Sequence, residues 1–87
     1  MKITTDRKPP SDFSAPAKSI IIGNLYEHYK GLSYKVIAIA RHSETLEEVV
    51  VYQACYGAKD VWVRPVTIFT ETITINGKTQ PRFKSIS

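Results

Sequence analysis

The sequence has only one cysteine, Cys55, so the chain cannot form an internal disulfide bond. A disulfide-stapled secreted scaffold is therefore not indicated, and a reducing cytoplasm is the predicted location. The longest unbroken apolar run has five residues, 36–40, whereas a helix needs roughly 20 to cross a bilayer. Lys2 is not followed by the apolar stretch of a signal peptide. We therefore predict a cytoplasmic protein with no membrane partner.

Phosphate-binding loops and compact metal sites are also missing. The four glycines are isolated from one another, so none belongs to a glycine-rich loop. His28 and His42 are fourteen residues apart, which matches no compact zinc spacing when Cys55 is the only thiol. We assign no metal, no cofactor and no catalytic residue from the sequence.

The formal net charge of +4 is concentrated at the two ends of the chain. Residues 72–87 contain three basic side chains and no acidic one, while residues 19–71 contain five basic and six acidic side chains. A nucleic-acid-binding domain normally carries its basic residues on the folded part. Nucleic-acid binding is therefore only a second alternative function.

Eighty-seven residues fit a single small domain with a modest core. Residues 1–18 include three prolines and no periodic apolar pattern, which predicts a flexible, disordered N-terminal arm. Residues 19–87 form the predicted domain.

Short β-branched and aromatic runs bounded by turn residues predict an all-β fold. The expected strands are residues 19–29 with a bulge at Gly23 and Asn24, then 34–41, 49–56, 61–64, 72–75 and roughly 78–83. Asn76-Gly77 predicts a tight hairpin, and a second hairpin should connect strands 34–41 and 49–56. One short helical turn is expected, at 45–48 or 66–69. These elements predict a small five- to six-stranded SH3-like barrel.

Several short motifs occur at fixed spacing: His28-Tyr29-Lys30-Gly31, His42-Ser43-Glu44-Thr45, Val50-Val51-Tyr52, Tyr56-Gly57 and Trp62-Val63-Arg64-Pro65. Together they resemble a family of small bacterial proteins catalogued as a domain of unknown function, DUF1653. The resemblance covers about residues 23–71. It implies a small β-rich domain of the bacterial cytoplasm and implies no activity.

The segment His42-Ser43-Glu44 combines an imidazole, a hydroxyl and a carboxylate, which suggests a small hydrolase or transferase using His42 and Glu44. Adjacent residues of an extended chain point to opposite faces, and catalytic triads usually draw on distant segments. A turn whose polar side chains bond their own backbone is the favoured interpretation.

Aromatic rings and arginines form the other candidate surface, because rings stack on ligands and guanidinium groups bind anions. Within this set of aromatic residues, we expect Trp62 and Tyr34 to be buried in the core. We predict a binding module that recognises a small or anionic ligand, or a protein partner. The predicted binding residues are His28, Tyr29, His42, Ser43, Glu44, Tyr52, Trp62 and Arg64.

Overall fold

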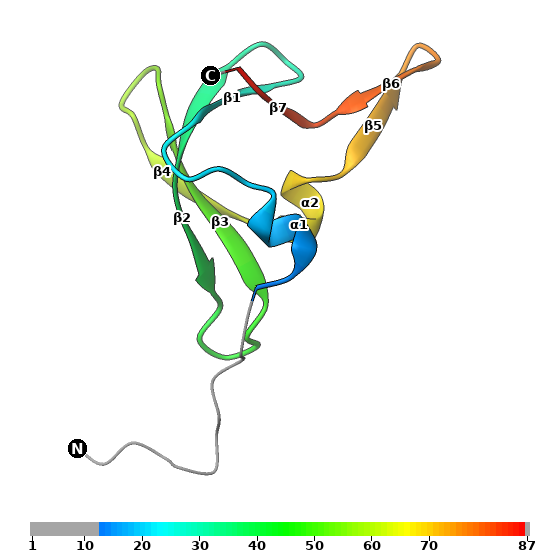
Figure 1. The fold of residues 1–87 in the computed structure, drawn as a ribbon. Coiled ribbons are helices and arrows are strands. Elements are labelled where there is room, and N and C mark those ends of the chain that lie inside the picture. The colour runs from blue at the N-terminus through cyan, green and yellow to red at the C-terminus, as the bar shows by residue number, and fades with distance from the viewer. Residues whose placement is uncertain (1–12, 87) are drawn as a thin grey trace, which may run out of the picture.

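The computed structural model describes residues 13–86. These residues form seven strands and two one-turn helices (Figure 1). In chain order the elements are α1 (Ala15–Lys18), β1 (Leu25–His28), β2 (Ser33–Arg41), β3 (Glu48–Ala54), β4 (Val61–Pro65), α2 (Val66–Phe69), β5 (Thr72–Ile75), β6 (Lys78–Pro81) and β7 (Phe83–Ser85). An antiparallel sheet has the strand order β4-β3-β2-β1-β7, and β5 and β6 pair separately. The predicted all-β class is confirmed.

The described strands do not close into a barrel, so the SH3-like closure is not confirmed. The residues predicted as one strand, 78–83, divide into β6, which pairs with β5, and β7, which pairs with β1. Pro81 ends β6 because it has no N–H to donate, and Arg82 N then donates to Glu71 O instead. Strands β4 and β7 remain the two edges of the larger sheet.

The β2–β3 hairpin was predicted across residues 42–48 and is confirmed, with Tyr34 opposite Ala54 and Arg41 opposite Glu48. A register shift between Val36 and Ala38 inserts an extra residue into β2. Such a bulge changes which face later side chains occupy. Val36 is fully buried and Ile39 also packs against the core, although simple alternation placed them on opposite faces.

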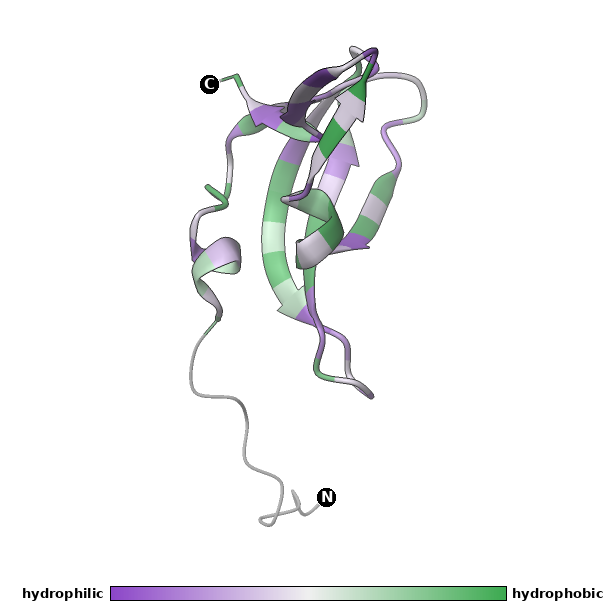
Figure 2. Cartoon of the chain, turned by 90° about the vertical axis from the view of Figure 1, so that its right-hand side faces the viewer, coloured by the Kyte–Doolittle hydropathy of each residue, from purple (hydrophilic) through white to green (hydrophobic). Residues whose placement is uncertain are grey.

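The core lies between the five-stranded sheet and the two helices, and α1 lies beside α2 (Figure 1). Figure 2 shows apolar stretches along the middle of the central strands, residues 36–40 of β2 and 49–52 of β3, with polar residues at the strand ends. Phe69 of α2 stacks on Phe83 of β7 with ring centroids 4.1 Å apart. The buried hydrophobic residues are Ala17, Ile20, Tyr26, Val36, Val50, Tyr52, Ala54, Val66, Phe69 and Phe83.

The predicted start of the first strand was wrong, and only one of the two candidate helical turns is present. Strand β1 begins at Leu25 rather than at residue 19, because the chain turns at Gly23, whose φ of 91° suits glycine. Residues 45–48 form no helix, and the helical turn is α2.

The predicted arm also ends too late. Ser14 caps α1 and bonds the Glu48 carboxylate, and Ala17 of α1 is buried in the core. Residues 13–18 therefore pack on the domain, while the rest of the predicted arm, 1–12, lies outside the described residues.

Candidate ligand-binding site

Arg64 is held in place by two contacts on the core-facing side of the sheet. It lies opposite the buried Val50, which directs its side chain toward that side. Its Nε atom donates to the Tyr52 hydroxyl across 3.0 Å, and its guanidinium carbon lies 5.5 Å from the centre of the Phe83 ring. No carboxylate among residues 13–86 forms an ion pair with Arg64. Its terminal nitrogens thus keep donors for a ligand.

His28, at the end of β1, contacts the same phenylalanine. The centroid of its ring lies 4.9 Å from that of the Phe83 ring and 4.4 Å from that of the Tyr29 ring. The Nδ1 atom of His28 accepts a hydrogen bond from Lys30 N across 3.2 Å, so Nε2 carries the proton in the neutral ring. Burial, followed by the positive charges of Arg64, Arg82 and Lys30, lowers the pKa of His28. The imidazole is therefore a neutral donor near pH 7.

Three tyrosines complete this cluster. Tyr34 lies 5.2 Å from the Tyr52 ring and 5.5 Å from the Tyr56 ring, and its hydroxyl bonds that of Tyr56. Burial and this hydrogen bond raise the pKa of Tyr34 to about 12. Tyr34 therefore stays protonated and uncharged at neutral pH. Tyr34 was expected to be buried but is half-buried.

The turn containing His42, Ser43 and Glu44 does not join the cluster. It lies at the far end of β2, a nine-residue strand that spans roughly 26 Å at about 3.3 Å per residue. His42 Nδ1 accepts from the backbone N–H groups of Glu44 and Thr45, at 3.1 and 3.3 Å. The prediction that polar side chains of this turn bond the backbone of the turn itself is confirmed for His42.

Trp62 was expected in the core, but its side chain is 52% exposed. It lies opposite Tyr52 and therefore on the same face of the sheet. Strand β4 is an edge strand, so no neighbour covers its outer side. Tyr52, by contrast, is only 3% exposed.

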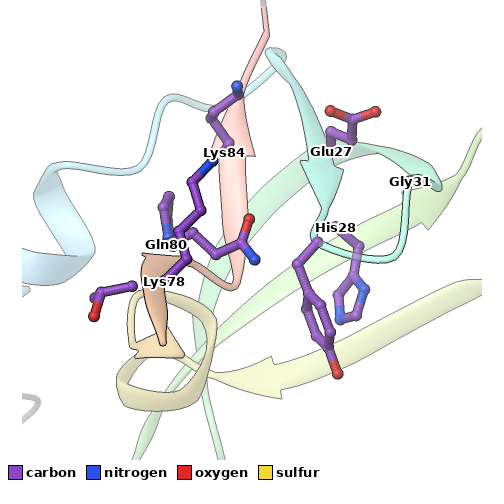
Figure 3. Close-up of a pocket in the computed structure, with 9 residues that line it drawn as sticks. Glu27, His28, Gly31, Lys78, Gln80 and Lys84 are labelled. Carbon is purple, nitrogen blue, oxygen red and sulfur yellow. The ribbon is translucent and has the colours of Figure 1, made fainter. Parts of the chain in front are cut away.

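A cavity of about 350 Å³ opens beside His28 (Figure 3). Residues from β1 and the β1–β2 turn form one wall: Glu27, His28, Tyr29 and Gly31. Residues 78–81 of β6 and Lys84 of β7 form the other.

Comparison with known proteins assigns the chain to a family. Residues 24–85 match the family described as protein of unknown function (DUF1653). The chain belongs to the DUF1653 family. It is also similar to the crystal structure of a protein belonging to DUF1653 from Bordetella bronchiseptica, with a TM-score of 0.73 and 35% sequence identity over 80% of this chain and 91% of that one. No curated protein matches the chain.

The structure of this DUF1653 chain brings together His28, Tyr29, Tyr52 and Arg64 of the predicted set and separates the His42–Glu44 turn from them. Sequence reasoning missed Phe83, which links His28 to Arg64 through ring contacts. It also assigned Lys78 and Lys84 to a basic tail, whereas both line the cavity. The Asn76-Gly77 signal predicted that residues 78–83 return as a strand of the domain, but it did not indicate that they line a cavity beside His28.

The described part of this DUF1653 chain contains no group of three or more side chains suited to a metal ion. Within residues 13–86, no helix has both the length and the apolar character needed to cross a membrane.

Proposed function

We propose that this DUF1653 protein is a binding module that recognises a small ligand through an anionic group held by Arg64. One observation carries the proposal: the guanidinium is fixed by Tyr52 and Phe83 and has no carboxylate partner among the described residues. Guanidinium nitrogens match the geometry of a carboxylate or phosphate. A side chain that is already held loses little conformational entropy on binding.

The groups around Arg64 support the same ligand class. His28 offers its Nε2–H, and the Tyr34 hydroxyl remains neutral, so neither side chain repels an anion. The hydrolase alternative has no comparable support, because His42 binds its own turn and makes no hydrogen bond to the Glu44 carboxylate.

The test is binding of inorganic phosphate, pyrophosphate and succinate, measured by thermal shift and isothermal titration calorimetry. Charged hydrogen bonds contribute about 1.5–3 kcal/mol, so Arg64→Gln should weaken binding by roughly tenfold or more. Lys35→Gln is the matched control, because Lys35 is an exposed basic residue of the same sheet. It directly precedes the buried Val36 in β2, so its side chain lies on the face of the sheet away from the core.

Arg64→Lys separates charge from geometry, since lysine keeps the positive charge but cannot form a two-nitrogen contact. It should retain part of the affinity. Equal affinities of the wild type and Arg64→Gln, with the fold intact by circular dichroism, would contradict the proposal. So would an equal loss in Lys35→Gln.

A further inference from the structure

The cavity beside His28 has positive charge on one wall and polar groups on both. Lys84 and Gln80 lie across the opening from His28 (Figure 3). Lys78 also belongs to this wall, and Thr79 adds a hydroxyl. The opposite wall contains Tyr29 and Glu27.

Neither lysine of the cavity is neutralised by an ion pair. No carboxylate among residues 13–86 lies within 4.0 Å of the Lys78 or Lys84 ammonium group. Glu27 lies opposite Lys84 in the β1–β7 pair but forms no ion pair with it. Glu71, the other acidic residue near this end of the sheet, is paired with Arg82. Further positive charge lies nearby, because the Lys30 ammonium group is 5.8 Å from the centre of the Tyr29 ring. The potential in the cavity therefore favours an anion.

The size and lining of the cavity narrow the class of anion. About 350 Å³ is within the range of small-molecule sites and exceeds the space of one phosphate group. Lysine is a point-charge binder of phosphate. Glu27, Thr79 and Gln80 supply acceptors and donors suited to ligand hydroxyl groups.

We infer that this cavity binds a sugar phosphate, either free or as the sugar-phosphate part of a nucleotide. Lys78 and Lys84 hold the phosphate, while Glu27 and Gln80 bond the sugar hydroxyls. Arg64 does not line the cavity, but His28 belongs to both sites, so the two sites are neighbours that share one side chain.

The test is titration of the full chain with ribose 5-phosphate, followed by calorimetry and by backbone amide NMR shifts. Ribose, AMP and a short single-stranded oligodeoxynucleotide are measured in parallel. The double variant Lys78→Gln/Lys84→Gln should weaken binding of ribose 5-phosphate at least tenfold. The control Lys35→Gln/Lys59→Gln removes the same charge outside the cavity and should leave affinity within about twofold, since distant surface charges are screened by salt.

The parallel ligands identify the source of the sugar phosphate. Binding of ribose 5-phosphate but not AMP supports a free sugar phosphate, and binding of both supports a nucleotide. Undetectable binding of ribose 5-phosphate and AMP would overturn the inference. So would equal affinity for ribose, or equal losses in the two double variants. Arg64→Gln should weaken this binding less than Lys78→Gln/Lys84→Gln does, because Arg64 does not line the cavity. A larger loss in Arg64→Gln than in the double lysine variant would place the ligand at the Arg64 site and overturn the inference.

Discussion

The Arg64 Nε atom donates to the Tyr52 hydroxyl oxygen across 3.0 Å, and both side chains contact Phe83. A charged group on an edge strand is thereby tied to a ring that is almost fully buried in the neighbouring strand. This connection positions the guanidinium and also contributes to the stability of the sheet.

The change Tyr52→Phe should lower the free energy of unfolding by about 1.5 kcal/mol, because it removes the acceptor of a charged hydrogen bond and keeps the ring. It should also weaken anion binding, since Arg64 then loses one of its two supports. Urea unfolding measures the first effect and calorimetry the second. Tyr29→Phe is the control: no described residue bonds its hydroxyl, so its stability should stay within about 0.5 kcal/mol. Unchanged unfolding of Tyr52→Phe would show that the bond is not formed in solution.

Glu48 should make the folded state sensitive to acid. The Ser14 hydroxyl, then the Ser14 backbone N–H and the charge of Arg41, lower the pKa of Glu48 in the folded chain. A lowered pKa gives stability that is present above the unfolded pKa and is lost as the pH falls through the folded pKa. Thermal unfolding between pH 6 and roughly pH 2 should show this loss, reduced in Glu48→Gln and retained in the neighbouring Glu47→Gln. The same acid dependence in wild type and Glu48→Gln would argue against the contact.

His28 should also make the folded state less stable as the pH falls, at a higher pH than Glu48 does. Because its pKa is lowered in the folded state, the unfolded chain binds the proton more tightly, and stability falls as the pH drops from about 6.5 toward the folded pKa. His28→Gln should abolish this slope and His42→Gln should keep it. Bound anions should raise the pKa of His28, which NMR titration of its ring protons can follow. A pKa of His28 above 6.5 without ligand would contradict the burial that the structure gives it.

The central hairpin could be predicted because both signals for it are local. Val36–Ala40 and Val49–Tyr52 have the residue types of strands, and the polar turn between them is short. Strand β5 and the Asn76-Gly77 turn were predicted for the same reason. Asn76 and Gly77 both have the positive φ angles that such a tight hairpin turn requires.

Other features depend on contacts between distant segments, which local patterns do not encode. The bulge after Val36 and the separate pairing of β6 and β7 are set by long-range register. Tryptophan is a residue type often found in protein cores, but Trp62 is exposed because it lies on the edge strand β4. The link from His28 through Phe83 to Arg64 joins residues up to 55 positions apart and has no sequence motif.

The most direct measurement is the NMR resonance of the Arg64 side-chain Nε–H group during titration with pyrophosphate. The resonance is assigned by its absence in Arg64→Gln. If Arg64 holds the anion, this resonance should shift with the same dissociation constant that calorimetry gives, and the backbone amides of the His42–Glu44 turn should stay unchanged. An unmoved Arg64 resonance, with saturable shifts confined to that turn, would contradict the proposed site.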